Sequence, residues 1–154
     1  MLNRIAEISN FYGTTLRRER ELYFSHCLRV ASKVQEAGLP WKCVELALLH
    51  DILELDNVTY IDTLDDIQKG TLNILTAYKD ESSQDHFLRV LNSGDIWALV
   101  IKYYDNLDNS VFTDEDKVFT EKVLHKDSNE EIQKYLTRAK MIKEKLFLQG
   151  VFVG

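Results

Sequence analysis

The stretch that decides the fold is WKCVELALLHDILEL, residues 41–55, which follows the only proline of the chain, Pro40. Apolar residues occur on most sides of this segment when it is drawn as a helix, so it predicts a helix buried at the centre of the domain. A proline is favourable at the start of such a helix, and we expect the helix to end at Asn57. Two polar residues, His50 and Asp51, interrupt the apolar run.

Helical spacing of the apolar residues continues through the rest of the chain. After a short amphipathic start at residues 2–8, the expected helices cover residues 19–37, 63–78, 83–92, 95–108, 114–124 and 129–148. Asp127 and Glu130 have the spacing of a capping box at the start of the last helix. Alternating strand patterns, internal repeats and flexible linkers are absent from the sequence. We therefore expect one all-α domain over residues 1–154, a helical bundle built round a buried central helix.

Composition and charge exclude several classes of protein. The chain of 154 residues is 45% hydrophobic, which argues against disorder, and its 25 acidic and 19 basic side chains give a net charge of −6. The longest apolar run, residues 46–49, is too short to cross a bilayer. We expect a cytoplasmic protein that binds neither nucleic acid nor membrane. Cys27 and Cys43 lie in apolar surroundings without CxxC spacing, so we expect buried free thiols.

Polar side chains that can bind a metal occur where the helical pattern expects apolar ones, at His26, His50, Asp51 and Asp105. Burying such groups without partners is costly, so each needs a strong partner. One divalent cation bound by two imidazoles and two carboxylates would satisfy all four residues, and manganese, iron or zinc suits this ligand set. Taken singly, a buried histidine is more often hydrogen-bonded in a core, and Asp51 could pair with Arg29 or Lys102. The combination favours a metal, and because a domain of this size can fold without one, the metal would serve chemistry.

Three segments carry a resemblance to a known family: YFSHCLRVA at residues 23–31, ELALLHDILELDNVT at 45–59 and ALVIKYYDNLDN at 98–109. Their order and spacing resemble the HD-domain metal-dependent phosphohydrolases. Within that superfamily they are most similar to the RelA/SpoT-type alarmone hydrolases and their small stand-alone relatives, which remove pyrophosphate from the 3′ position of guanosine tetraphosphate. The similarity covers about residues 15–110, whereas residues 114–148 match only as generic helix.

The resemblance implies a role for each matching residue. The divalent ion, Mn²⁺ first with Fe, Zn or Co as alternatives, would be bound by His26, His50, Asp51 and Asp105. Glu54 would be the catalytic acid beside the attacking water. On a continuous α-helix Glu54 would also share a face with His50 and Asp51, from which it lies four and three residues away. If Glu54 is not the base, Asp56 is the next acidic residue that could accept the proton of the attacking water. The expected substrate-binding residues are Arg17, Arg18, Tyr23, Lys102 and Asn109.

The sequence also departs from the family pattern. Leu55 replaces the second acid of the family's Glu-Asp pair, Asn106 replaces a basic residue, and Glu21-Leu22 stands where the family has Gly-Glu-Pro. Despite these departures, the resemblance implies a small nucleotide substrate. The first interpretation is an enzyme that releases 3′-pyrophosphate from a guanosine alarmone. A 5′-nucleotidase acting on deoxynucleoside monophosphates and a degenerate, nucleotide-binding HD domain are the alternatives. A homo-oligomer is compatible with each reading.

Overall fold

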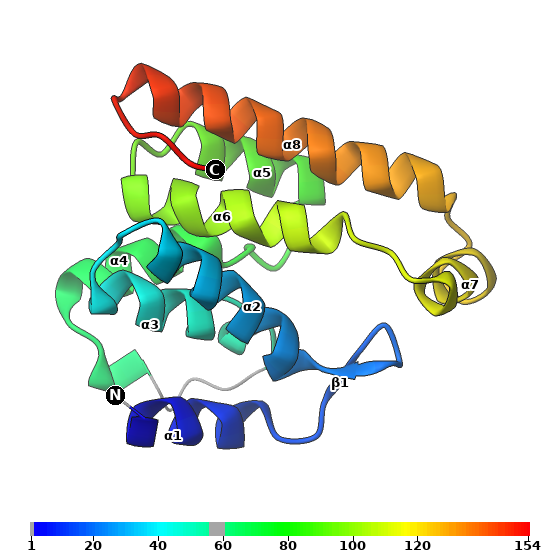
Figure 1. Cartoon of the computed structure of the whole chain (residues 1–154), viewed down its shortest axis with the longest axis horizontal. Helices are drawn as coiled ribbons and strands as arrows, with labels where there is room; N and C mark the ends of the chain where they lie inside the picture. The colour runs from blue at the N-terminus through cyan, green and yellow to red at the C-terminus, as the bar shows by residue number, and fades with distance from the viewer. Residues whose placement is uncertain (1, 56–60) are drawn as a thin grey trace.

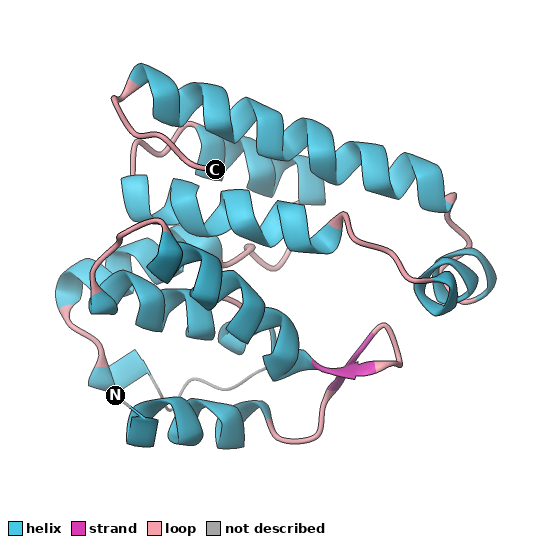
Figure 2. Ribbon diagram, in the orientation of Figure 1, coloured by secondary structure: helices cyan, strands magenta, loops and turns pink. Residues whose placement is uncertain are grey.

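A computed structural model describes residues 2–55 and 61–154 of the chain, which fold as a bundle of helices (Figures 1 and 2). The expected all-α fold is confirmed. In chain order the elements are α1 (Leu2–Tyr12), β1 (Leu16–Arg17), β2 (Glu21–Leu22), α2 (Tyr23–Glu36), α3 (Trp41–Leu49), two 3-10 helices (Ile52–Leu55 and Ile61–Thr63), α4 (Asp66–Leu75), α5 (Ser83–Leu91), α6 (Ile96–Asn109), α7 (Asp114–Lys122) and α8 (Ser128–Leu148).

The core lies around α3 and α6. Every residue of α3 from Cys43 to Leu49 is buried, as the apolar run predicts. Helix α3 packs on α2, and α2 in turn packs on α6, whose other side contacts α8. Figure 1 shows α6 between α8 on one side and α2 with α3 on the other. Residues from three different helices can therefore meet where α2, the end of α3 and α6 come together.

The central helix is shorter than predicted. Helix α3 ends at Leu49, and the chain continues through a turn at Asp51 into a 3-10 helix, so the expectation of one α-helix reaching Asn57 is wrong. Two side chains bind carbonyls in the last turn of α3: His50 Nδ1 donates to the Ala47 oxygen at 2.6 Å, and the Tyr12 hydroxyl donates to the Leu48 oxygen at 2.8 Å. The apolar pattern continues past this point because Ile52 is also fully buried.

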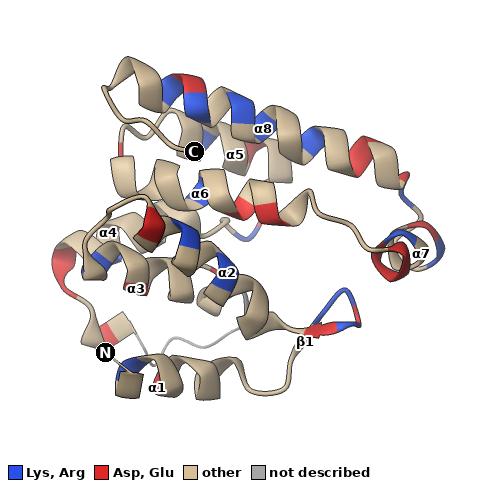
Figure 3. Ribbon diagram, in the orientation of Figure 1, with Lys and Arg blue, Asp and Glu red and all other residues tan. Residues whose placement is uncertain are grey.

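A two-stranded hairpin precedes α2 where the sequence predicted helix. Strands β1 and β2 pair antiparallel, with Arg17 opposite Glu21, so residues 19–22 are not helical and α2 begins at Tyr23. The tip is basic (Figure 3) and places Arg18 and Glu19 at φ values of 55° and 56°, a conformation that non-glycine residues adopt at some cost. Ion pairs from Arg18 and Arg20 to the fully buried Asp116 of α7 hold the tip in this shape.

The remaining helices follow the sequence closely. Helices α5 to α8 begin and end within two residues of the expected ranges, whereas α4 is shorter than the predicted 63–78 because Asp65 and Gln68 form a capping box at its start. Asp127 caps α8 by accepting from the Glu130 backbone N–H. Both cysteines are buried and unpaired, as expected. Within the described residues, none of the helices is both long and apolar enough to span a bilayer.

Candidate metal centre

The structure brings together the four candidate ligands that the sequence singled out. His26 comes from the first turns of α2, His50 and Asp51 from the end of α3, and Asp105 from α6. The Nε2 atoms of His26 and His50 lie 3.0 and 3.2 Å from Asp105 Oδ1, and His50 Nε2 lies 3.1 Å from Asp51 Oδ2. One nitrogen or oxygen from each of the four residues lies within 4.8 Å of the others. Such a cluster can hold one divalent ion.

Each histidine also has a partner on the side facing away from the cluster. His26 Nδ1 donates to Asp108 Oδ2 at 2.6 Å, and His50 Nδ1 donates to the Ala47 carbonyl at 2.6 Å. A carbonyl oxygen can only accept, so His50 Nδ1 carries a proton and Nε2 can be the unprotonated, metal-binding nitrogen. Metal-binding histidines usually have this arrangement, in which a carboxylate or carbonyl fixes the tautomer and the ring orientation.

The cluster combines buried carboxylates with buried imidazoles, and each kind favours the charged form of the other. Burial lowers the pKa of His26, but hydrogen bonds to Asp105 and Asp108 outweigh this effect and raise the pKa overall. Burial likewise opposes ionisation of Asp105, yet Lys102 and His50 hold its pKa well below the ordinary value. The carboxylates are therefore negative at neutral pH, and a cation can take the place of the histidine protons that compensate them.

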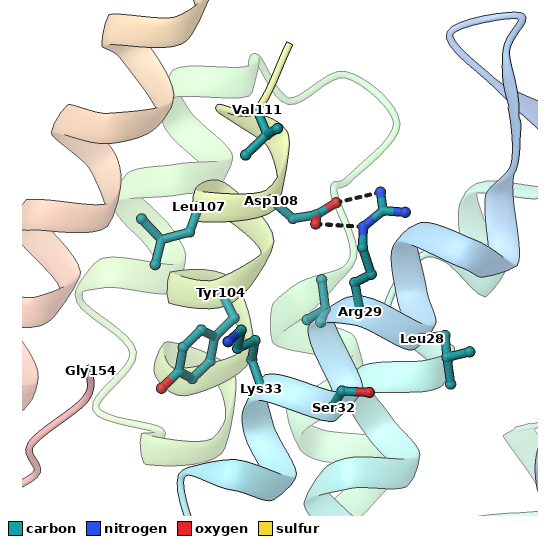
Figure 4. Close-up of a pocket in the computed structure, with 10 residues that line it drawn as sticks. Leu28, Arg29, Ser32, Lys33, Tyr104, Leu107, Asp108, Val111 and Gly154 are labelled. Atoms are coloured by element: carbon teal, nitrogen blue, oxygen red, sulfur yellow. Dashed lines mark hydrogen bonds and ion pairs between the residues drawn. The ribbon is translucent and has the colours of Figure 1, made fainter. Parts of the chain in front are cut away.

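Asp108 connects the cluster to the protein surface. Arg29 of α2 donates to both carboxylate oxygens of Asp108, at 2.8 and 2.9 Å, and also to Glu21 at 2.8 Å. Figure 4 shows the Asp108–Arg29 pair at the edge of a hollow of about 570 Å³ that is lined mainly by apolar groups such as Tyr104 and Val111. None of the four cluster residues lines this hollow. The sequence analysis had considered an ion pair between Arg29 and Asp51. In the structure, Arg29 pairs with Asp108 and Glu21 instead.

A second cavity, of about 480 Å³, opens directly onto the cluster. His26, Asp51 and Asp105 form part of its wall, and all five expected substrate-binding residues line it: Arg17, Arg18, Tyr23, Lys102 and Asn109. These residues contact the cluster or one another. Lys102 Nζ lies 3.2 Å from Asp105 Oδ2, Asn109 Nδ2 donates to Asp105 Oδ1 at 3.2 Å, and the Tyr23 and His26 rings meet edge-on with centroids 6.2 Å apart. The cavity joins the cluster to basic side chains that can bind phosphate.

The two expected catalytic acids cannot be placed in this site. Asp56 and the side chain of Glu54 lie outside the described residues, so both roles remain predictions. The geometric argument for Glu54 was wrong in its premise, because the α-helix ends at Leu49 and its four-residue spacing does not extend to Glu54. Asn106, which departs from the family pattern, lies in the cavity wall and donates to the Lys102 carbonyl at 2.8 Å.

Sequence reasoning missed two residues that bear on the site. Asp108, which binds His26 from outside the cluster, was not assigned a role, although it lies three residues after Asp105 and therefore on the same side of the helix. Arg138 lines the cavity that opens onto the cluster, and its position in α8 carried a signal: it is buried in series with Ile142 and Leu146, at four-residue intervals. The criterion that identified His26, a polar residue at a position expected to be apolar, would also have identified Arg138.

The fold and the cluster together define a class: an all-α bundle with a candidate metal centre of two histidines and two aspartates at the wall of a cavity that also has basic lining residues. No family model matches the chain. The chain is 28% identical to a guanosine-3′,5′-bis(diphosphate) 3′-pyrophosphohydrolase of Aquifex aeolicus (strain VF5), over 64% of this chain. It spans 15% of the length of that relative. The chain is thus distantly similar to a hydrolase, and this similarity supports an enzymatic role.

Proposed function

We propose that the protein is a metal-dependent hydrolase that removes pyrophosphate from the 3′ position of a guanosine bis(diphosphate). The observation that carries the proposal is the cluster of His26, His50, Asp51 and Asp105, whose possible ligand atoms lie within 4.8 Å of one another at the wall of a basic cavity. The activity named for the Aquifex aeolicus relative supports the choice of substrate. The reaction consumes water and gives pyrophosphate and guanosine 5′-diphosphate.

A divalent ion bound at the cluster, with Mn²⁺ as the first choice, would supply Lewis-acid activation of water and of the 3′-diphosphate. The chain's own residues would orient and neutralise the substrate. Arg17 donates to Asn109 Oδ1 at 2.7 Å, and Asn109 in turn donates to Asp105, so one hydrogen-bonded chain runs from the cavity wall to the cluster. These two hydrogen bonds fix the Asn109 amide in the cavity wall next to Asp105, where it would contact the 3′-diphosphate of a bound substrate. Lys102 lies on the same wall, and its ammonium could offset negative charge on the 3′-diphosphate while water attacks the phosphorus and the bond to the ribose 3′ oxygen breaks.

A hydrolysis panel tests the proposal. Purified protein supplemented with Mn²⁺ is assayed on guanosine 3′,5′-bis(diphosphate) and on the deoxynucleoside 5′-monophosphates, with release of pyrophosphate and of phosphate measured separately. The proposal predicts pyrophosphate release from the bis(diphosphate), its loss after chelation and its return when metal is added. The alarmone hydrolases that this chain resembles have a basic residue at the position of Asn106. Because asparagine supplies no positive charge there, we expect slow turnover. Phosphate release from the monophosphates alone would identify a 5′-nucleotidase instead, and binding without hydrolysis would identify a nucleotide-binding protein.

A further inference from the structure

The wall of the cavity contributed by α8 holds an arginine that forms no ion pair with the described side chains. The side chain of Arg138 is 8% exposed and lines the same cavity as the cluster. Its NH1 and NH2 atoms donate to Ser83 Oγ at 3.0 Å and to Gln84 Oε1 at 3.1 Å, and both acceptors are neutral. Its Nε atom is buried without a hydrogen-bond partner, the one such side-chain atom in the described part of the chain. None of the ion pairs formed by the described side chains includes Arg138.

A buried cation without an ion pair is costly to a fold, and the nearby Glu131 and Tyr135 offset only part of the effect of burial on Arg138. Burial lowers the pKa of Arg138, because removal from water disfavours the charged guanidinium. Arginine nevertheless remains protonated at neutral pH. A guanidinium has five N–H groups, and only two of them are used in these contacts. Further hydrogens on NH1 and NH2 can therefore donate to an anion in the cavity. A buried charge that the protein compensates incompletely costs free energy, and an anion in the cavity would supply the missing compensation.

The start of α5 lies against this arginine. Helix α5 has nine residues, is capped by the Ser82 hydroxyl, and begins at Ser83, which lines the cavity and accepts from Arg138. The first turn of any helix has backbone N–H groups without intrahelical partners and a partial positive charge, a combination that binds phosphate groups. The helix end and the buried arginine thus offer positive charge and hydrogen-bond donors at one place.

Two ionisable residues of the cavity lining near the start of α5, His86 and Glu81, are compatible with an anion. His86 lies one turn further along α5, and burial together with Lys102 and Arg89 lowers its pKa, so it is neutral and adds no charge. Glu81 lies just before α5 in the cavity lining, and Arg89 binds both of its carboxylate oxygens, at 2.8 and 2.9 Å. The negative charge of Glu81 is therefore compensated by Arg89 and does not serve Arg138.

We propose that Arg138 and the N-terminus of α5 form a second anion subsite, which binds the phosphate group of the substrate that is not attacked. The inference rests on the proposed function and adds to it the residues that would bind the second phosphate-bearing position of the nucleotide. The 3′-diphosphate would lie at the cluster and the 5′-diphosphate at Arg138. A nucleoside monophosphate bound through the cluster has no second phosphate for this subsite.

Two variants and a control test the subsite by equilibrium binding to the metal-loaded protein, with GDP and guanosine as probes. Arg138→Met removes the charge, and Ser83→Asp places a carboxylate beside the guanidinium at the first turn of a helix, where negative charge is favourable. We expect each variant to weaken GDP binding about 10- to 100-fold, the effect of losing a charged hydrogen bond, without changing guanosine binding. Lys140→Met, an exposed lysine on the same helix, should change neither.

Ser83→Asp should also raise the melting temperature, because the new carboxylate pairs with Arg138 in the free protein. In kinetics on guanosine 3′,5′-bis(diphosphate), Arg138→Met should raise KM more than it lowers kcat, as expected when binding energy common to the substrate and the transition state is lost.

The outcomes separate the subsite from the proposed function. Unchanged GDP binding in a folded Arg138→Met or Ser83→Asp variant would overturn the subsite, while hydrolysis of the bis(diphosphate) by wild type would leave the proposed function standing. Weaker GDP binding in the variants of a protein that hydrolyses no nucleotide would support the subsite and reject the function. If Arg138→Met fails to fold, Ser83→Asp decides the question, since that substitution stabilises α5.

Discussion

Replacement of Asp108 by asparagine should weaken metal binding although Asp108 is not itself a candidate ligand. Its Oδ2 atom accepts a hydrogen bond from the Nδ1–H group of His26, with 2.6 Å between oxygen and nitrogen. This contact keeps the proton on Nδ1 and leaves Nε2 facing the cluster. In Asp108→Asn the acceptor is neutral, and the amide can also turn its NH₂ group towards the ring and favour the wrong tautomer. Asp108 acts as a positioning residue for His26.

The structure indicates which effect of this substitution is large. The hydrogen bond from His26 to the carboxylate is buried on the histidine side and involves a charged acceptor, which corresponds to about 1.5 to 3 kcal/mol. Loss of such an outer partner typically weakens metal affinity about 10- to 100-fold. The ion pair between Asp108 and Arg29 contributes much less to stability, because the arginine side chain is 46% exposed and water screens the pair. We therefore expect a large change in metal affinity and a small change in melting temperature.

The assay is competition between the protein and a chelating dye for Mn²⁺ or Zn²⁺. Glu21→Gln is the matched control, because it removes the other carboxylate bound by Arg29 without contact to His26. Affinity within about twofold of wild type in Asp108→Asn would refute the positioning role, since an outer-shell partner normally changes affinity at least about tenfold. Equal losses in both variants would attribute the effect to Arg29 instead.

Three further predictions concern other residues. Glu54→Gln should keep the metal content and slow hydrolysis about 100-fold or more, the scale expected for loss of a positioned base; an unchanged rate would move that role to Asp56. Asp116→Asn should lower the free energy of unfolding by about 1 to 3 kcal/mol at neutral pH. Burial opposes ionisation of Asp116, but Arg20 and the Thr113 backbone lower its pKa to about 2, so its stabilisation is full above about pH 4. The difference between wild type and Asp116→Asn in denaturant titrations should therefore shrink as pH falls from 4 towards 2, and a constant difference would contradict the assignment. Burial raises the pKa of Cys27 to about 12, so this thiol should react with a thiol reagent at pH 8 only after unfolding; rapid labelling of the folded protein would contradict its burial.

The sequence was most informative where burial and polarity conflict. His26, His50, Asp51 and Asp105 each occupy a position where helical spacing expects an apolar side chain, and the structure brings all four together. That pattern is readable because a buried polar group needs a partner wherever the fold places it. Long helices such as α6 and α8 were likewise predictable, because apolar residues at helical spacing over a long segment are buried together only if the segment is a helix.

Other features depend on contacts between distant residues and were not predictable from local pattern. At the end of α3, the Leu48 carbonyl accepts a hydrogen bond from the Tyr12 hydroxyl of another helix, 36 residues away in the sequence. The hairpin before α2 has no glycine to mark its turn, and its unusual backbone at Arg18 is held by Asp116, 98 residues away. Such partners are set by the tertiary fold, so the local helical pattern gave the wrong element at residues 19–22.

The metal content of the purified protein tests the central claim most directly. Wild type and His50→Ala would be loaded with Mn²⁺, freed of excess ion by gel filtration and analysed for metal per chain, with melting curves to show that both are folded. We predict one ion per wild-type chain, loss of that ion in His50→Ala, and a wild type that remains folded after chelation because its core is apolar and does not depend on the ion. Stoichiometric metal in a folded His50→Ala variant, or a wild type that binds no divalent ion, would contradict the metal centre.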